Sequence, residues 1–243
     1  MSARRITLDT RIIEPARFAH RRVLVPEVLG DSEAADSRPR GAAASHRARM
    51  VEGFVRSVSR RAREGARVLD VGAGTGEIAV ELALKRPDLR ITGIDLSAGM
   101  LRTARRRVRE AGVTRQVRMR KANARRLPFP GGSFDLVISS SVLHHLPDPG
   151  STFDEIARVL ARRGSVFIRD LRRPAPSRMK EHIRRHGRFY HGERRRLFAE
   201  SVRAAFKVSE MREIVEESRL AGCRVRPQLA TYLVIEGSPR RRG

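Results

Sequence analysis

Short apolar runs alternate with amphipathic stretches along most of the chain. Apolar runs with little polar alternation predict buried parallel strands, and here they fall at 68–71, 91–95, 117–121, 134–139 and 165–170. Apolar residues at helical spacing predict helices, and these fall at 46–63, 78–83, 100–111 and 151–162. Ser97 is expected to cap the third of these helices, and Ser151 and Asp154 have the spacing of a capping box for the fourth. Strands that alternate with helices are typical of an α/β fold with a mainly parallel sheet.

The alternation breaks after residue 170. Residues 171–208 contain many arginines and three histidines, and helical spacing is visible over 189–206. A further helix is expected at 209–220, and two closing strands are expected at 223–226 and 230–236. The closing strands bring the expected sheet to seven strands.

The N-terminal region differs from the rest in composition. Residues 31–45 are mostly small and polar and include proline and glycine, which is typical of a loose linker. We therefore expect an N-terminal arm with a flexible linker over 1–50 and one domain over 51–243. That domain carries an insertion at about 171–208.

The charge is strongly positive. The 243 residues include 52 lysines and arginines against 27 acidic residues, a net charge of +25. One interpretation is a polyanionic partner such as nucleic acid. The other is compositional drift, because there are only four lysines and one asparagine, as a GC-rich genome would produce. Aromatic residues, which stack bases in many nucleic-acid binders, are few.

Membrane and secretory signals are weak. Apolar runs stay well short of the roughly 20 residues that a membrane span needs. The N-terminus lacks the apolar core of a secretory signal. The single cysteine, Cys223, excludes an intramolecular disulfide and a four-cysteine zinc site. These features predict a cytoplasmic protein.

A glycine-rich turn follows the first strand, in the sequence RVLDVGAGTGEIA (67–79). Gly72, Gly74 and Gly76 can take positive φ and let the backbone approach a ligand closely. In an open parallel sheet, a ligand binds beyond the carboxyl ends of the strands. The turn therefore predicts a nucleotide or nucleoside site.

Two carboxylates near the turn limit which class of ligand can bind there. Dinucleotide sites have glycine or alanine at the sixth position of the glycine motif, whereas this chain has Glu77, and Asp70 lies just before the turn. An anionic dinucleotide therefore fits poorly, which disfavours a nicotinamide-dependent oxidoreductase. A nucleoside with a positive group fits better. Asp95 ends the second strand 19 residues after Gly76, where an acidic residue binds ribose hydroxyls in this fold.

Several motifs together carry a family resemblance. The segments VLDVGAGTG, GIDLSAGML, LPFPGGSFDLVISSSVLHHLPDP and EIARVLARRGSVFIRD resemble the class I, seven-stranded S-adenosylmethionine-dependent methyltransferases. The resemblance covers Arg67 to Asp170 and is similar to the small-molecule branch that includes ubiquinone and menaquinone biosynthesis enzymes. It implies a Rossmann-like, doubly wound sheet with a helical N-terminal arm and a lid insertion after the fifth strand.

The resemblance also implies a binding role for particular residues. It implies S-adenosyl-L-methionine as the methyl donor. Asp70 would orient the amino group, Asp95 would bind the ribose and Leu96 would contact the adenine. Asn123, after the third strand, would meet the adenine amino group. Many relatives have Asp-Ala there, whereas this chain has Asn123-Ala124, which keeps an oxygen acceptor but loses the charge. The remaining implied contacts to the methionine part come from Gly72, Ala73, Gly74, Gly76 and Ser139.

Histidines after the fourth strand are candidates for catalysis. Methyl transfer needs a general base only when the nucleophile must lose a proton, and histidine titrates near neutral pH. His144 and His145 lie at the expected mouth of the site, although the same LHHLPD sequence could be a turn whose histidines only pack. No metal is expected, because His182, His186 and His191 have few carboxylates nearby.

The leading functional hypothesis is a methyltransferase that acts on a small molecule. An RNA methyltransferase that modifies ribose or a base is an alternative suggested by the charge. The sequence Ser-Ser-Ser-Val at 139–142 does not resemble the Asn/Asp-Pro-Pro-aromatic run of enzymes that methylate exocyclic amines. A non-catalytic scaffold that keeps the cofactor site is a further alternative. The sequence does not indicate an oligomeric state.

Overall fold

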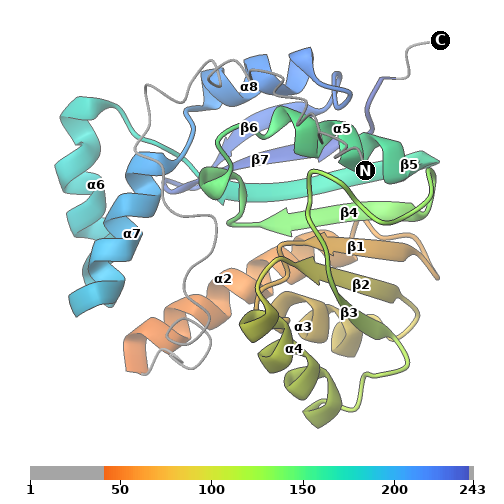
Figure 1. Cartoon of the computed structure of the whole chain (residues 1–243). Helices are drawn as coiled ribbons and strands as arrows, with labels where there is room; N and C mark the ends of the chain where they lie inside the picture. Colours follow the sequence, from red (N-terminus) through yellow and green to blue (C-terminus); the bar gives the residue numbers. More distant parts are fainter. Residues whose placement is uncertain (1–40, 241–243) are drawn as a thin grey trace, which may run out of the picture.

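The described part of the chain is built on one seven-stranded sheet. A computed structural model describes residues 41–240. The strand order is β3-β2-β1-β4-β5-β7-β6, and β7 alone runs antiparallel to both of its neighbours. The expected α/β fold with a mainly parallel sheet is confirmed (Figure 1). The strands are β1 (Arg67–Val71), β2 (Arg90–Asp95), β3 (Val117–Lys121), β4 (Phe134–Ser140), β5 (Leu160–Leu171), β6 (Arg224–Gln228) and β7 (Tyr232–Gly237).

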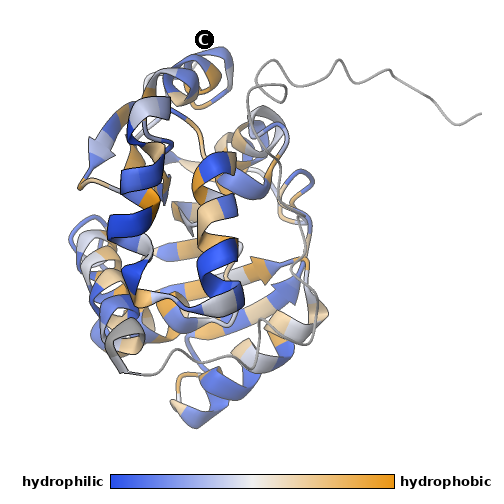
Figure 2. Ribbon diagram, turned by 90° about the vertical axis from the view of Figure 1, so that its left-hand side faces the viewer, coloured by the Kyte–Doolittle hydropathy of each residue, from blue (hydrophilic) through white to orange (hydrophobic). Residues whose placement is uncertain are grey.

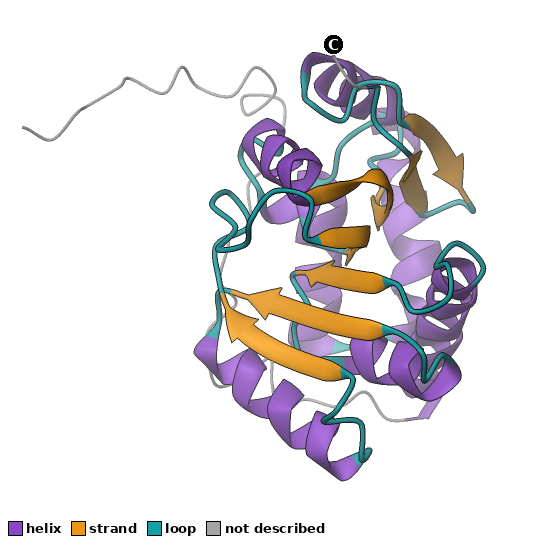
Figure 3. Ribbon diagram, turned by 90° about the vertical axis from the view of Figure 1, so that its right-hand side faces the viewer, coloured by secondary structure: helices purple, strands orange, loops and turns teal. Residues whose placement is uncertain are grey.

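Helices cover both faces of the sheet. The helices α2 (Gly41–Ser59), α3 (Glu77–Lys85) and α4 (Ala98–Glu110) lie on one face, and α5 (Gly150–Val159) and α8 (Val208–Glu217) lie on the other (Figures 1 and 3). Each face has its own apolar core. Because the strands are buried on both faces, their sequences are nearly continuous apolar runs.

Two helix boundaries differ from the predictions. Helix α2 begins at Gly41, so 41–45 are helical rather than linker, which agrees with the high helix propensity of an alanine-rich stretch. The boundary predicted at residue 50 thus lies inside α2, and the arm at 1–40 lies outside the described residues. Helix α5 ends at Val159, because 160–162 extend β5 instead.

The two predicted helix caps have different outcomes. Ser97 caps α4 as predicted, since its Oγ accepts a hydrogen bond from the backbone N–H of Met100. The capping box predicted for Ser151 and Asp154 is not formed. Pro149 is the N-cap residue of α5, and Asp154 accepts a long-range hydrogen bond from the N–H of Arg219 (2.8 Å).

The segment between β5 and α8 forms a helical insertion. It contains η3 (Pro176–Arg178), α6 (Met179–His186), η4 (Gly187–Phe189) and α7 (Gly192–Ala204). Figure 1 shows α6 and α7 at the side of the molecule where β4 ends. Most residues on the outside of these helices are hydrophilic (Figure 2). A small apolar cluster fixes the insertion to the body; it contains Leu171, Val202 and Ala205, with Met179, Ile183, Phe198 and Tyr232 packed against it.

The described helices are not suited to crossing a membrane. Across residues 41–240, no helix combines the length and the apolar composition that a span requires.

Candidate active site

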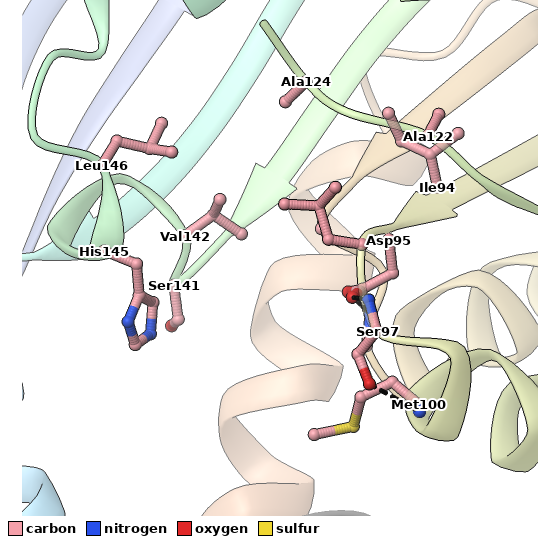
Figure 4. A pocket seen from close by; sticks show the side chains of 13 residues that line it. Ile94, Asp95, Ser97, Met100, Ala122, Ala124, Ser141, Val142, His145 and Leu146 are labelled. Atoms are coloured by element: carbon pink, nitrogen blue, oxygen red, sulfur yellow. Dashed lines mark hydrogen bonds between the residues drawn. The ribbon is translucent and has the colours of Figure 1, made fainter. Parts of the chain in front are cut away.

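A cavity opens at the carboxyl ends of the central strands. Strand β1 pairs with β2 on one side and with β4 on the other, so the chain reverses its direction of progress across the sheet here. Ligands bind at such switch points in open α/β sheets. The cavity measures about 200 Å³. It is lined by Gly72, Gly74, Ile94, Asp95, Leu96, Ser97, Met100, Ala122, Ala124, Ser141, Val142, His145 and Leu146 (Figure 4).

The first glycine of the turn, Gly72, has no room for a side chain. Gly72 has φ +71°, and a Cβ atom there would lie 2.2 Å from Cγ2 of Val142. Gly74 also has positive φ, +53°, but a Cβ atom there would meet nothing within 4 Å. The turn therefore packs tightly against Val142 at Gly72 and leaves open space at Gly74, beside the cavity.

Asp95 connects the glycine turn to the start of α4. Its Oδ2 accepts a hydrogen bond from the N–H of Gly74 (2.8 Å), and its Oδ1 accepts one from the N–H of Ser97 (2.9 Å). The side chain lines the cavity, as do Leu96 and Ala124. Three residues predicted to bind the cofactor are thus brought together around one space.

Asp70 is a buried carboxylate with one unsatisfied oxygen. The residue is 1% exposed, and its Oδ2 has no hydrogen-bond partner among the described residues. Burial, and then the negative charge of Asp95, raise the pKa of Asp70 to about 7. A buried acceptor without a donor is costly, so this carboxylate is suited to a positively charged ligand group.

Besides Asp70 and His144, four further predicted site residues do not line the cavity. The hydroxyl of Ser139 donates to the carbonyl of Val71 (2.8 Å), and Oδ1 of Asn123 accepts from the N–H of Arg125 (2.9 Å). Gly76 is the N-cap residue of α3. Ala73 hydrogen-bonds through its N–H to the carbonyl of Ile94. These four residues shape the turns around the cavity, and their contact with a cofactor remains a prediction.

The two candidate catalytic histidines lie in different environments. His145 lines the cavity, and Figure 4 shows its ring on the side opposite Ser97 and Met100. His144 is 3% exposed, and its Nδ1 lies 2.7 Å from Oδ1 of Asp170. The two imidazole centroids are 4.1 Å apart. His145 is therefore placed to reach a ligand, and His144 is placed to support it.

Asp170 organises the turn that carries these histidines. Its Oδ2 accepts a hydrogen bond from the N–H of Leu143 (2.6 Å), and its Oδ1 also accepts one from the N–H of Leu171 (2.7 Å). Burial alone would raise the pKa of Asp170, but the charge of His144 and the hydrogen bonds from His144 and Leu143 outweigh it and lower the pKa. The carboxylate thus fixes the 3₁₀ turn Leu143–His145 to the end of β5.

Ser141 is a site residue that the sequence analysis did not single out. It is a non-glycine residue with φ +63°, a conformation that is rare outside glycine and concentrates at functional sites. Its N–H donates to the carbonyl of Arg169 (2.9 Å), and the residue lines the cavity. The three consecutive serines at the end of an apolar run are the sequence feature from which this site residue could have been predicted.

The described histidines and acids do not gather into a metal site. Within residues 41–240, no group of three or more metal-ligating side chains comes together. The rings of His182 and His186 lie 4.5 Å apart on α6. Burial, and then the positive charge of His186, lower the pKa of His182 to about 4.

Comparisons with known proteins point to one family. Residues 69–168 match a family model described as a methyltransferase domain. The chain is 43% identical over 98 residues to a malonyl-[acyl-carrier protein] O-methyltransferase of Geobacter sulfurreducens, which covers 40% of this chain and 36% of the relative. It is 30% identical over 121 residues to a ubiquinone/menaquinone biosynthesis C-methyltransferase of Coxiella burnetii. The aligned region covers 49% of this chain and 48% of the relative.

The fold is also shared with solved structures. A crystal structure of a SAM dependent methyltransferase from Aquifex aeolicus matches with a TM-score of 0.57 at 21% identity, over 75% of this chain and 87% of that chain. This likeness concerns the fold. The chain covers about a third to a half of the length of the two curated relatives.

Proposed function

Because the chain contains a methyltransferase domain of the class I, S-adenosylmethionine-dependent type, we propose that it transfers a methyl group from this donor to a small molecule. The observation that carries the proposal is the cavity beside the glycine turn, together with the unsatisfied carboxylate of Asp70, two residues before the first glycine of that turn. A sulfonium nucleoside with an ammonium group matches both features.

The residues around the cavity fit the donor. Asp70 would hold the ammonium group, and the open backbone at Gly74 would leave room for the methionine part. Asp95 would accept hydrogen bonds from the ribose, and Leu96 and Met100 would contact the adenine. When bound, the donor supplies an electrophilic methyl group on a sulfonium. The protein's contribution is to hold the acceptor close and aligned.

His145 is the general base in this proposal. Its position in the cavity wall places it near an acceptor that lies over the glycine turn. Asp170 holds Nδ1 of His144, and His144 packs against the ring of His145. Asp170 and His144 are therefore positioning residues. The proton would leave the acceptor's nucleophilic atom for an imidazole nitrogen of His145.

A small-molecule acceptor is supported by the relative that is named as a C-methyltransferase of ubiquinone/menaquinone biosynthesis. The insertion formed by α6 and α7 lies at the strand ends where an acceptor would approach (Figure 1). We infer that this insertion covers the acceptor.

A methyl-transfer screen tests this function. The full chain is incubated with S-adenosylmethionine that carries a labelled methyl group, together with metabolite extracts, total RNA or bulk protein in separate reactions. We expect label in small molecules and none in RNA. Label in RNA would overturn the acceptor class. Cofactor binding without transfer to any fraction would favour a non-catalytic scaffold.

We predict that binding of S-adenosylhomocysteine depends on pH through Asp70. Its pKa of about 7 in the free protein means that the carboxyl is protonated below pH 7, and only the carboxylate attracts the ligand's ammonium. Affinity should therefore fall as the pH is lowered from 8 to 5.5, by up to about tenfold per pH unit. The free energy of unfolding of the free protein should rise over the same fall in pH, because ionising the buried carboxyl destabilises the folded state.

Isothermal titration calorimetry checks this prediction. Asp70→Asn should bind weakly and with little pH dependence. Asp148→Asn is the control, because it makes the same change at a carboxylate that lies outside the cavity wall and accepts a hydrogen bond from the N–H of Gly150. Asp95 and His145 also face the cavity, so Asp95→Asn and His145→Gln are measured in parallel. An unchanged pH profile in Asp70→Asn would show that another group titrates.

A further inference from the structure

Arg169 is a buried cation whose hydrogen bonds and ring contacts are all to uncharged groups. It lies near the end of β5 and is 6% exposed. One terminal nitrogen donates to the carbonyl of Met50 (3.0 Å), and the other donates to Oγ of Ser140 (3.3 Å). The guanidinium carbon lies 4.7 Å from the ring centre of Phe54 and 4.9 Å from that of Tyr232. Arg169 therefore packs between two aromatic side chains and two neutral acceptors.

Within residues 41–240, no carboxylate forms an ion pair with Arg169. The adjacent Asp170 is engaged with Leu143 and His144. Arginines that have a carboxylate partner behave differently, since the hydrogen bond that Arg67 donates to Asp135 raises the pKa of Arg67. For Arg169, burial lowers the pKa, and the nearby Tyr232 and Asp170 offset only part of this effect. A buried charge without a counter-ion is costly, so this site is suited to an anion that comes from outside.

The buried polar atoms of this region that lack a hydrogen-bond partner are nitrogens. The Nε atom of Arg169 is buried and has no acceptor among the described residues. The same is true of Nε of Arg172 and of Nε2 of His182. His182 is next to Ile183, and Ile183 and Tyr232 both pack against the apolar cluster under the insertion. Three unsatisfied nitrogen atoms thus occur on elements that meet around Tyr232.

Arg169 is also close to the cavity. Its carbonyl accepts the hydrogen bond from Ser141, and its guanidinium contacts Ser140, the residue before it. Ser141 lines the cavity. On the other side, the rings of Tyr190 and Phe198 stack at 5.3 Å between the insertion's helices. The rings of Phe54 and Tyr232 against Arg169, and the apolar cluster against which Tyr232 packs, therefore make part of this region aromatic and apolar.

We propose that the methyl acceptor is an apolar molecule with a carboxylate and that Arg169 binds this carboxylate. The inference rests on the proposed function. Nε and a terminal nitrogen form one planar edge of the guanidinium, and such an edge binds a planar carboxylate through two parallel hydrogen bonds. Because Arg169 is almost fully covered, acceptor binding should displace α2 or the 179–204 insertion, which cover this side of β5.

The test compares an acid with its neutral amide. The probes are 3-phenylpropanoate and 3-phenylpropanamide, titrated by ligand-detected NMR into the full chain saturated with S-adenosylhomocysteine. The ionic strength is about 0.15 M, which screens charges beyond about 8 Å. We expect the acid to bind about tenfold more tightly than the amide. In Arg169→Met, the acid should bind only as well as the amide.

Arg61→Met is the matched control. Arg61 also stacks on an aromatic ring, that of Phe167, but it has a carboxylate partner in Glu236 (2.6 Å). This variant should keep the preference for the acid. If Arg169→Met does not fold, Arg169→Lys keeps the charge without the planar edge and should lose most of the preference.

Three results would overturn the inference. They are equal binding of acid and amide by the wild type, a preference that survives in the Arg169 variants, and a loss of S-adenosylhomocysteine affinity in those variants with no change in the preference. The last result would assign Arg169 to the cofactor's own carboxylate. S-adenosylhomocysteine binding is measured first, so its absence would contradict the proposed function rather than this inference.

Discussion

Replacing Gly72 by alanine is expected to abolish cofactor binding and to destabilise the fold. The new Cβ atom would lie 2.2 Å from Cγ2 of Val142, and the backbone has φ +71°. Steric overlap in a packed site costs about 1–3 kcal/mol, and the left-handed conformation adds about 1 kcal/mol. Relief of the overlap would move Val142 and the turn that carries His145. We expect a loss of about 3 kcal/mol in the free energy of unfolding and at least about a hundredfold loss in S-adenosylhomocysteine affinity.

Gly112→Ala is the control for this variant. Gly112 has φ +70°, so the backbone strain is the same, but a Cβ atom there would meet nothing within 4 Å. It should cost about 1 kcal/mol and leave cofactor affinity unchanged. Urea unfolding and calorimetry measure both quantities. Equal stability losses in the two variants would show that contact with Val142 does not constrain the glycine turn.

Replacing Asp170 by asparagine should reduce turnover by about a hundredfold. The carboxylate accepts hydrogen bonds from Leu143, His144 and Leu171, and an amide would turn an N–H group toward at least one of these donors. His144 would lose its fixed tautomer, and the turn that carries His145 would loosen. We expect kcat to fall more than the affinity for S-adenosylhomocysteine, because Asp170 does not line the cavity.

The same variant should change the acid stability of the protein. The pKa of Asp170 is lowered in the folded state, so its contribution to stability is present above the ordinary carboxyl pKa of about 4 and is lost as the pH falls through the lowered value. Asp170→Asn should lack this part of the acid transition. ¹⁵N NMR of the imidazoles reports the tautomer of His144. An unchanged tautomer and unchanged turnover would contradict a positioning role, and Asp148→Asn should be neutral in both measurements.

The parts of the fold that follow local patterns could be predicted from the sequence. Strand β3 was predicted at its observed bounds, and Ser97 caps α4 as expected. The glycine turn and Asp95 were identified because their spacing reflects one βαβ unit. In each case, residues that are close in the sequence determine the outcome.

The remaining features depend on contacts between distant residues. Strand β5 extends back to Leu160 because Leu160 pairs with Phe134 of β4, which the helical spacing of 151–162 does not reveal. Ser139 was expected near the ligand, but its hydroxyl bonds to Val71 on β1. The pairing of His144 with Asp170, 26 residues later, and the neutral hydrogen-bond partners of Arg169 also arise from tertiary packing.

Titration of the full chain with S-adenosylhomocysteine tests the central claim most directly. We expect saturable binding of one molecule per chain with a Kd between about 1 μM and 1 mM, the usual range for enzyme substrates, and we expect Gly72→Ala to abolish it. An absence of binding by the folded wild type at millimolar ligand would contradict the assignment of the cavity to this cofactor.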